Sequence, residues 1–258
     1  MNFRIATYNV HRCRGIDGRL RPERIVEVLR EVDADVVALQ EVVAEGDGSE
    51  NQARYIGETL GVHWALGENR KLDGAAYGNV VLSRYPLRVM KNHDISVAGR
   101  ERRGAFHTDV MLGPNDAVHV FNIHLGTAFV ERRHQGRRLS ERGSGILHDR
   151  ALTGPKVVLG DFNEWTTGLA SKLLGSHLKS VEVEKKLRRK RSYPGFLPLL
   201  HLDHIYYDGP LELLKLTVHR TRKSVIASDH LPLVADFKYV MGKERTSEPP
   251  DAEVVREA

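Results

Sequence analysis

The chain of 258 residues has little of what typically stabilises secreted or membrane proteins. It contains one cysteine, Cys13, so no disulfide can form within it. No apolar run approaches the ~20 residues that cross a bilayer. The N-terminal stretch "MNFRIATYNV" alternates like a strand and lacks the apolar core and small-residue cleavage site of a signal peptide. These absences argue against a disulfide framework and predict a soluble, cytoplasmic protein.

A strong charge bias is also absent. Lys and Arg number 39 against 34 Asp and Glu, which leaves a net charge of +5. This mild surplus favours polyanionic partners, but it is equally typical of ordinary soluble proteins. Hydrophobic residues make up 41% of the chain, enough to bury a substantial core. We place one folded domain in residues 1–241 and expect the polar, proline-bearing residues 242–258 to be a disordered tail.

Short segments rich in Val, Ile and Phe, bounded by Gly, Pro, Asp or Asn, predict β-strands. They cover residues 3–10, 35–42, 79–87, 106–112, 117–125, 156–163, 202–209 and 231–240. Helical patterns occur over residues 21–32, 52–60 and 168–174, and a charged helix is expected around residues 132–150, broken by Gly143 and Gly145. Strands outnumber helices without regular alternation, which favours mixed sheets with helices outside over a doubly wound parallel sheet.

Polar side chains gather at the ends of these predicted strands. They are Asn9, Glu41, Asn122, His124, Asp161, Asn163, Asp203, Asp229 and His230. A single acid at such a position is usually a turn or a helix cap. Several buried carboxylates near one another instead require a compensating cation or strong hydrogen bonds. The group as a whole therefore indicates a functional site.

The two-residue period of a strand adds to this interpretation. In "GDFN", Asp161 and Asn163 project from the same side of an extended chain while Phe162 points away. In "NIHL" the same holds for Asn122 and His124. Each strand end thus presents polar groups on one face and anchors an apolar residue on the other.

In their order, these motifs resemble the endonuclease/exonuclease/phosphatase superfamily of metal-dependent phosphoesterases. The resemblance runs from Ile5 to Phe237 and rests on "TYNV", "LQEV", "GNVVLSRYPL", "NIHLG", "GDFN" and "SDHLPLVADF". The segment "SYPGFLPLLHLDHIYY" is most similar to a bacterial subgroup of small, single-domain members. Membership implies an α/β fold of the α+β type, a four-layer sandwich of two packed mixed β-sheets flanked by helices, with the strand ends gathered at one rim.

The resemblance also implies a metal site. Glu41 corresponds to the principal metal ligand, with Asn9 beside it and Asp229 nearby. Carboxylate and amide oxygens are hard ligands that suit Mg²⁺ or Mn²⁺, and the lack of a thiolate near Glu41 argues against structural zinc. A dication there polarises the phosphoryl group and stabilises the leaving oxygen.

Catalytic roles follow from the same resemblance. Asp161 corresponds to the residue that orients or deprotonates the attacking water, and Asn163 to a donor to phosphate oxygen. His230 corresponds to the catalytic imidazole, which Asp203 holds, and His124 to a second histidine that contacts phosphate or assists the leaving group. A carboxylate partner orients a histidine and raises its pKa, which suits proton transfer near neutral pH.

Four further residues are candidates for substrate binding, each with a structural alternative. Asn122 either contacts phosphate or only braces the site. Tyr77 and Asn79 line the pocket or are polar groups at a strand edge. Arg103 reaches a phosphate or is a solvated surface arginine. The histidines His63, His107 and His148 lack supporting context, and we expect them to be incidental.

The sequence departs from the nuclease pattern in one respect. Some nuclease members pair the counterpart of His124 with an acid near "AYGNVVLS", and no acid occurs from Ala75 to Ser83. A two-pair mechanism of that type is therefore in doubt. The basic run Lys185 to Arg191 could contact nucleic acid or anionic lipid headgroups, but we favour a solvated loop or helix face.

These observations predict a divalent-metal-dependent phosphodiester hydrolase acting on nucleic acid or a phospholipid headgroup. A phosphomonoesterase acting on a small or lipid phosphate is the alternative enzyme. A catalytically silent module that binds polyanions is the alternative of another class, although the complete set of polar residues argues against it. The natural substrate, the number of metal ions and the oligomeric state stay open.

Overall fold

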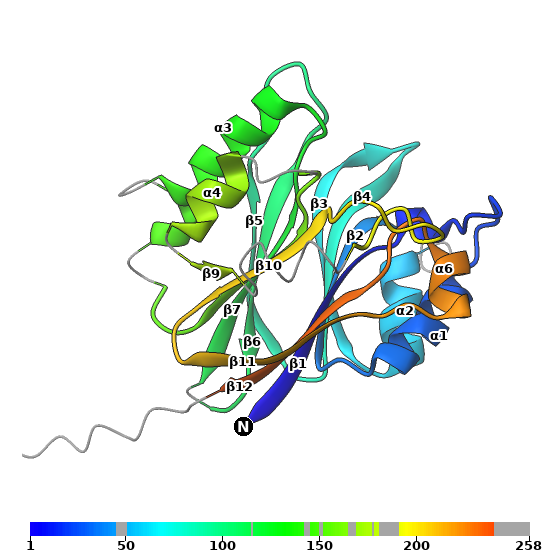
Figure 1. Cartoon of the computed structure of the whole chain (residues 1–258), viewed down its shortest axis with the longest axis horizontal. Coiled ribbons are helices and arrows are strands. Elements are labelled where there is room, and N and C mark those ends of the chain that lie inside the picture. The colour runs from blue at the N-terminus through cyan, green and yellow to red at the C-terminus, as the bar shows by residue number, and fades with distance from the viewer. Residues whose placement is uncertain are drawn as a thin grey trace, which may run out of the picture.

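Two β-sheets packed face to face form the centre of the protein, and helices cover both outer faces (Figure 1). The computed structural model describes residues 1–44, 51–114, 116–141, 145–149, 152–164, 169–176, 178–180 and 191–239. Helices α1, α2 and α6 lie against the first sheet, and α3 and α4 lie against the second. The predicted four-layer α/β sandwich with mixed sheets is confirmed.

The first sheet has six strands in the order β11-β12-β1-β2-β4-β3. Their bounds are Leu211–Val218, Leu233–Tyr239, Asn2–Asn9, Val36–Ala44, Ala75–Ser83 and His63–Leu72. The second sheet has six strands in the order β5-β6-β7-β8-β10-β9. Their bounds are Leu87–Asp94, Gly104–Met111, Ala117–His124, Lys156–Asp161, Asp203–Asp208 and Lys179–Ser180.

One parallel pair in each sheet makes the sheets mixed. β1 runs parallel to β2 and β7 runs parallel to β8, whereas the other pairs are antiparallel. A parallel connection needs a crossover, and α1 (Pro22–Val32) and α3 (Phe129–Ser140) lie in those two crossovers. The carboxyl ends of four central strands, β1, β2, β7 and β8, therefore point toward the same rim of the sandwich.

Strand alternation divides the apolar residues among three cores. Between the sheets lie side chains such as Ile5, Val120, Leu159 and Phe237, all fully buried. A second core joins the outer face of the first sheet to α1, α2 (Gln52–Leu60) and α6 (Arg222–Ala227), and a third joins the second sheet to α3 and α4 (Leu169–Gly175). Polar side chains that face inward at the strand ends are thus held between two packed sheets.

The helix predictions are confirmed with one change of length. α1 begins at Pro22, as a proline in the first turn predicts, and the Asn51 side chain caps α2 by accepting the Arg54 amide N–H at 3.0 Å. The charged helix expected over residues 132–150 is shorter: α3 begins at Phe129 and ends at Ser140, because Glu141 is already extended. A separate 3-10 turn, η2, spans Ile146–His148, and η1 spans His11–Cys13.

Two expectations fall outside the described residues. These are the tail at residues 242–258 and the basic run, of which only Arg191 is described. Within the described ranges, no helix has the length and apolar character needed to cross a membrane.

Candidate functional site

Strand register brings three of the predicted residues together at the rim of the second sheet. His124 on β7 is the register partner of Asp161 on β8, and Asp161 is the partner of Asp203 on β10. All three face the space between the sheets, because Val120, Leu159 and Ile205 on the same strand faces belong to the inner core. This pairing places the imidazole of His124 and the carboxylates of Asp161 and Asp203 in a row.

The first sheet contributes its residues from the opposite side. Asn9 at the end of β1 is the register partner of Gln40 on β2. The pairing of β2 with β4 shifts between Leu39 and Val42, and Glu41 adopts a left-handed φ of +59°. Such a bulge inserts one extra residue and re-aims its side chain. Leu39 and Val42 can therefore both face the helices while Gln40 and Glu41 are directed to the site.

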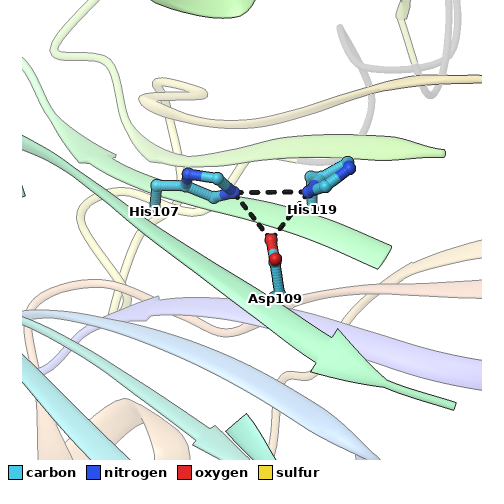
Figure 2. A group of neighbouring side chains, drawn as sticks. All are labelled: His107, Asp109 and His119. Atoms are coloured by element: carbon cyan, nitrogen blue, oxygen red, sulfur yellow. Dashed lines mark hydrogen bonds and ion pairs between the residues drawn. The ribbon is translucent and has the colours of Figure 1, made fainter. Parts of the chain in front are cut away.

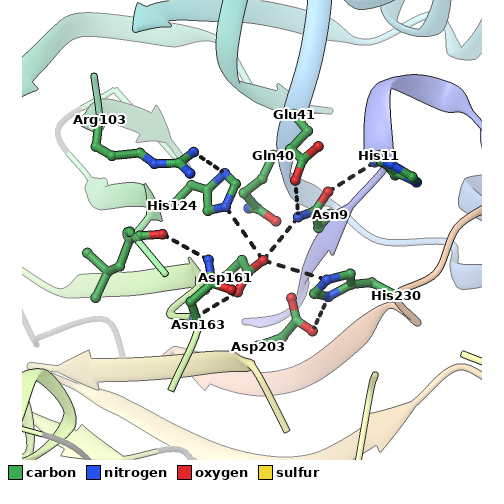
Figure 3. A network of polar contacts seen from close by, with 12 residues as sticks. Asn9, His11, Gln40, Glu41, Arg103, His124, Asp161, Asn163, Asp203 and His230 are labelled. Atoms are coloured by element: carbon green, nitrogen blue, oxygen red, sulfur yellow. Dashed lines mark hydrogen bonds and ion pairs between the residues drawn. The ribbon is translucent and has the colours of Figure 1, made fainter. Parts of the chain in front are cut away.

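Asp161 lies at the centre of the polar network (Figure 3). Its Oδ2 accepts an amide N–H of Asn9 at 3.0 Å and lies 3.7 Å from His124 Nε2 and 3.6 Å from His230 Nε2. Burial raises the pKa of Asp161 to about 6, against the opposing charge of His230. The preceding residue must be glycine: Gly160 has φ of +147°, and a Cβ there would lie 1.8 Å from the Ile123 carbonyl oxygen.

A loop before β12 (Leu233–Tyr239) supplies Asp229 and His230. Ser228 anchors this loop by donating its hydroxyl to the Asn9 carbonyl at 2.8 Å, and its Oγ accepts the His230 amide N–H at 3.3 Å. A loop near the far end of the chain is thus anchored to the end of β1.

His230 and Asp203 form the predicted pair. His230 Nδ1 lies 2.9 Å from Asp203 Oδ2, which also accepts the Ser192 hydroxyl. Burial alone would lower the pKa of His230, but the charges of Asp203 and Asp161 outweigh it and raise the pKa to about 10. His230 is therefore an imidazolium ion at neutral pH.

His124 is held in the opposite protonation state. Its Nδ1 accepts a hydrogen bond from Arg103 Nη1 at 3.0 Å, and Glu101 accepts from Arg103 Nη2 at 3.1 Å. Because a guanidinium only donates, His124 carries its proton on Nε2, which faces Asp161. Burial, and then the charges of Arg103 and His230, lower the pKa of His124 well below its usual value. An arginine thus stands beside this histidine.

The asparagine of the "GDFN" motif, Asn163, reaches the site by a turn rather than by strand alternation. β8 ends at Asp161, and Asn163 has a left-handed φ of +50°. Its backbone N–H donates to Asp161 Oδ1 and its side-chain amide donates to the Leu125 carbonyl, both at 2.9 Å. Phe162 is buried in the outer core, as predicted.

A cleft of about 420 Å³ opens over these groups. Its walls include most of the predicted site residues: Asn9, Glu41, Arg103, His124, Asp161, Asn163, Asp229 and His230. Asp203 is 1% exposed and lies behind His230. The remaining wall is formed by Thr127, Tyr193, Leu200 and Leu202. Glu41 and Asp161 share this one cleft, although 120 positions separate them in the sequence.

Three substrate-binding candidates lie outside this cleft. Asn122 is fully buried: its amide donates to the carbonyls of Leu39 and Val80, each at 2.8 Å, and its Oδ1 accepts from Gln40 at 2.7 Å. Asn79 is also fully buried, donating to the carbonyls of Gly104 and Asn122. These contacts leave neither amide free for phosphate, so the bracing role between the sheets replaces substrate binding for both.

Tyr77 and Asn9 also differ from their expected roles. Tyr77 is 5% exposed, and the Arg70 guanidinium lies 4.6 Å from its ring centroid. Asn9 points its amide nitrogen at Glu41 and Asp161, both at 3.0 Å, while its Oδ1 accepts the His11 backbone N–H at 3.0 Å. Asn9 is therefore a donor that holds two carboxylates, which leaves Glu41 and Asp229 as the oxygen donors for a metal.

Sequence reasoning missed four residues of the site. Gln40 joins Thr7 and Asn122 across the sheets, Ser192 donates to Asp203, the Tyr193 ring lies 4.8 Å from that of His230, and His11 Nδ1 lies 3.6 Å from Asp229 Oδ1. His11 is only two residues beyond Asn9, which was the one available signal. The others depend on the bulge or on a loop folding over the rim.

Comparisons of the sequence find similar proteins. The sequence model of the Endonuclease/Exonuclease/phosphatase family matches residues 6–230. The protein YbhP of Escherichia coli strain K12 is 30% identical over 251 residues, which cover 92% of this chain and 96% of YbhP.

Solved structures share the fold. An endonuclease/exonuclease/phosphatase from Beutenbergia cavernae superposes with a TM-score of 0.71 at 24% identity, covering 92% of this chain and 72% of that one. The mannosyl-6-phosphatase Bt3783 of Bacteroides thetaiotaomicron superposes with a TM-score of 0.73 at 15% identity, covering 92% of this chain and all of that one. At these identities the likeness shows the fold alone.

Proposed function

Because this chain belongs to the endonuclease/exonuclease/phosphatase family, whose members are generally hydrolytic, we propose that it is a divalent-metal-dependent phosphodiester hydrolase. The observation that carries the proposal is the environment of Asp161. Its Oδ2 lies within 3.7 Å of two imidazoles and within hydrogen-bonding distance of Asn9, inside the cleft that contains Glu41. These groups lie in one cleft, where Asp161 can accept a proton from water, an imidazole can donate a proton and Glu41 can bind a cation.

The donor set of the cleft fits Mg²⁺ or Mn²⁺. Glu41 and Asp229 present carboxylate oxygens, the ligands that hard dications prefer, and their charges would be costly together in a shared cleft without a cation. Bound there, the ion would polarise the phosphoryl group and offset the charge on its oxygens. Asn9 fits this role as a positioning residue, because its amide fixes the Glu41 carboxylate at 3.0 Å.

The side chains of the cleft have separate roles in the remaining steps of the reaction. Asp161 orients the attacking water and accepts its proton, since its carboxylate is held by Asn9 and by the Asn163 backbone N–H. His230, an imidazolium ion held by Asp203, donates to a phosphate oxygen and can protonate the departing ester oxygen. His124 stays neutral and donates from Nε2. A phosphorus–oxygen bond to water forms, and the bond to the leaving oxygen breaks.

Exposed apolar residues next in the chain to those that line the cleft favour a diester with an apolar portion, such as a phospholipid, over nucleic acid. The segments that contribute Tyr193, Leu200 and Thr127 to the cleft also carry large apolar side chains that are more than half exposed. These are Phe196, Leu197 and Leu199 beside the first two, and Phe129 and Val130 beside the third. Exposed apolar groups around a polar cleft are typical of interaction sites.

A phosphomonoesterase is the second candidate, and Arg103 is the observation that favours it. Its guanidinium reaches the cleft beside His124, where it adds a permanent positive charge. A monoester dianion would benefit more from that charge than a diester monoanion. The sugar phosphatase that shares the fold also acts on a monoester, according to its name.

One substrate panel tests these alternatives. The chelated protein is assayed with Mg²⁺ or Mn²⁺ on bis(p-nitrophenyl) phosphate, p-nitrophenyl phosphate, a short-chain phospholipid, and single- and double-stranded nucleic acids. We expect metal-dependent cleavage of diesters, with the phospholipid preferred among natural substrates. Faster turnover of the monoester would replace the proposal with the second candidate.

Substitutions of residues in the cleft test whether the activity belongs to it. His230→Gln should lower kcat by about 10²- to 10⁴-fold, the usual contribution of a general acid or base. Glu41→Gln should raise the Mg²⁺ concentration needed for half-maximal rate. Glu58→Gln, an exposed residue of α2, is the matched control and should change neither. Retained activity in both site variants would place the reaction elsewhere, and salt-sensitive polyanion binding without turnover would favour the silent module.

A further inference from the structure

A second polar cluster, drawn in Figure 2, lies on β6 and β7, on the outer face of the second sheet. His107 and Asp109 are two residues apart on β6 and share a face, and His119 on β7 is the register partner of Asp109. His119 shares its face of β7 with Phe121 of the outer core, whereas His124 faces inward. Five residues of strand separate His119 from His124, about 17 Å. His107, which lacks supporting context in the sequence, thus lies in a cluster with an acid and a second histidine.

The three side chains converge on one point. Asp109 Oδ1 lies 2.9 Å from His107 Nε2 and 2.7 Å from His119 Nδ1, and the two nitrogens are 3.4 Å apart. Ligands at 2.0–2.1 Å from a tetrahedral ion are separated by about 3.3 Å. The two nitrogens already have this spacing, and the carboxylate would need to move by roughly half an ångström. We propose that His107, Asp109 and His119 form a binding site for Zn²⁺ or a similar transition-metal ion.

The orientation of His119 provides an independent reason. Its other nitrogen, Nε2, lies 3.0 Å from the carbonyl oxygen of Thr153, which can only accept a hydrogen bond. Nε2 therefore carries a proton, and in the neutral ring this leaves the lone pair of Nδ1 directed at the cluster. Metal-binding histidines commonly donate their second N–H to a carbonyl in this way, which fixes the tautomer.

Packing holds the second imidazole in place. The ring of His107 stacks on Phe121 with centroids 4.3 Å apart and an interplanar angle of 11°, and His93 lies 6.2 Å away on a nearly parallel plane. Both rings therefore direct a nitrogen at the same oxygen of Asp109, at 2.9 and 2.7 Å. A metal ion would take all three of these atoms as ligands.

The ligand types separate this site from the cleft. Two imidazole nitrogens and one carboxylate suit Zn²⁺, Co²⁺ or Ni²⁺, whereas the carboxylates of the cleft suit Mg²⁺ or Mn²⁺. The histidine side chains are 7% and 9% exposed and Asp109 is 15% exposed, so the cluster is largely buried and Asp109 is its most accessible member. A metal here would clamp β6 to β7 and, through Thr153, to the segment entering β8, the strand of Asp161.

Metal titration of the full, tag-free chain tests the site. After chelation, Zn²⁺ binding is measured by calorimetry and Co²⁺ binding by visible absorption, in wild type, Glu41→Gln, Asp109→Asn and His119→Gln. Wild type and Glu41→Gln should bind Zn²⁺ equally and give the same Co²⁺ bands. His119→Gln should lose the Co²⁺ bands. Its Zn²⁺ affinity should fall by more than roughly 10- to 100-fold, which is the cost of losing a residue that only hydrogen-bonds to a metal ligand. His63→Gln, an exposed histidine on β3, should match wild type.

Asp109→Asn keeps the shape of the cluster and guards against misfolding of the histidine variant. Zn²⁺ should raise the Tm of wild type and leave the Tm of Asp109→Asn unchanged, with circular dichroism confirming the fold of each protein. Equal Zn²⁺ affinity in wild type, Asp109→Asn and His119→Gln would overturn the proposal. The proposal would also be overturned if all the Zn²⁺ binding seen in wild type were lost in Glu41→Gln. None of these measurements depends on phosphoester hydrolysis.

Discussion

Substitution of Asn122 separates its two possible roles, a brace between the sheets and a phosphate ligand. The most informative change is Asn122→Leu, which keeps the volume of the side chain and removes its hydrogen bonds. The structure shows three of them, to the carbonyls of Leu39 and Val80 and from Gln40, at 2.7–2.8 Å in a fully buried environment. Gln40 retains Thr7 and Ala38 as partners, but both carbonyls lose their side-chain donor.

The expected cost follows from these contacts. Each of the two buried carbonyls that loses its donor costs about 1–3 kcal/mol, and Gln40 keeps other partners, so the total is about 4 kcal/mol. In a chain of this size, that corresponds to a decrease in Tm of roughly 8–16 °C. Denaturant unfolding and differential scanning calorimetry measure the two quantities. Turnover of bis(p-nitrophenyl) phosphate, assayed well below the Tm of the variant, should fall by less than about tenfold.

Asn163→Gly is the matched comparison. Asn163 lines the cleft at φ of +50°, which glycine adopts without strain, and its removal leaves the Asp161 contact of its backbone N–H intact. We expect a clear loss of turnover with a small change in stability. The bracing interpretation would be refuted if Asn122→Leu unfolded at the wild-type temperature while losing turnover as Asn163→Gly does.

Three other predictions test separate parts of the structure. Burial lowers the pKa of His204 to about 4, and only the unfolded chain binds its proton between pH 6.5 and 4, so wild-type stability should fall by up to about 3 kcal/mol as pH drops through that window. His204→Phe should flatten this acid limb in denaturant titrations against pH, and an unchanged limb would contradict the assignment. Asp203→Asn removes the charge that holds His230 and should lower kcat by about 10²- to 10⁴-fold, whereas Ser192→Ala, which keeps the charge, should have a smaller effect; equal effects would refute the pairing. Gly160→Ala would place a Cβ 1.8 Å from the Ile123 carbonyl and should cost about 3 kcal/mol or more, so near-wild-type unfolding would refute the close approach of β7 and β8.

The predicted strands and the missed strands occupy different positions within the sheets. Every predicted segment is an interior strand of one of the two sheets, whereas β3, β5, β9 and β11 are the four sheet edges. An interior strand is covered on both faces and reads as an apolar run, as "VVALQ" in β2 does. An edge strand such as β11, in which Glu212 and Lys215 are exposed, alternates too weakly to be recognised as a strand.

For the site, the sequence pattern identified six residues at strand ends as candidates for chemistry: Glu41, His124, Asp161, Asp203, Asp229 and His230. It could not separate Asn122 from Asn163, because both are asparagines beside an apolar residue at the end of a strand. Only their neighbours distinguish them: Asn122 meets backbone carbonyls of the opposite sheet, and Asn163 meets the cleft.

By itself, the sequence determined which residue types stand at the ends of buried strands, because the apolar period and the polar terminus are local properties of the chain. Only the tertiary structure decided which of them meet. The register of β7, β8 and β10 aligns His124, Asp161 and Asp203, the bulge in β2 directs Glu41 to the rim, and Arg103 takes the place beside His124. The cluster of His107, Asp109 and His119 likewise depends on the pairing of β6 with β7. Such contacts join residues far apart in sequence, and their geometry is set by sheet pairing and packing rather than by any local pattern.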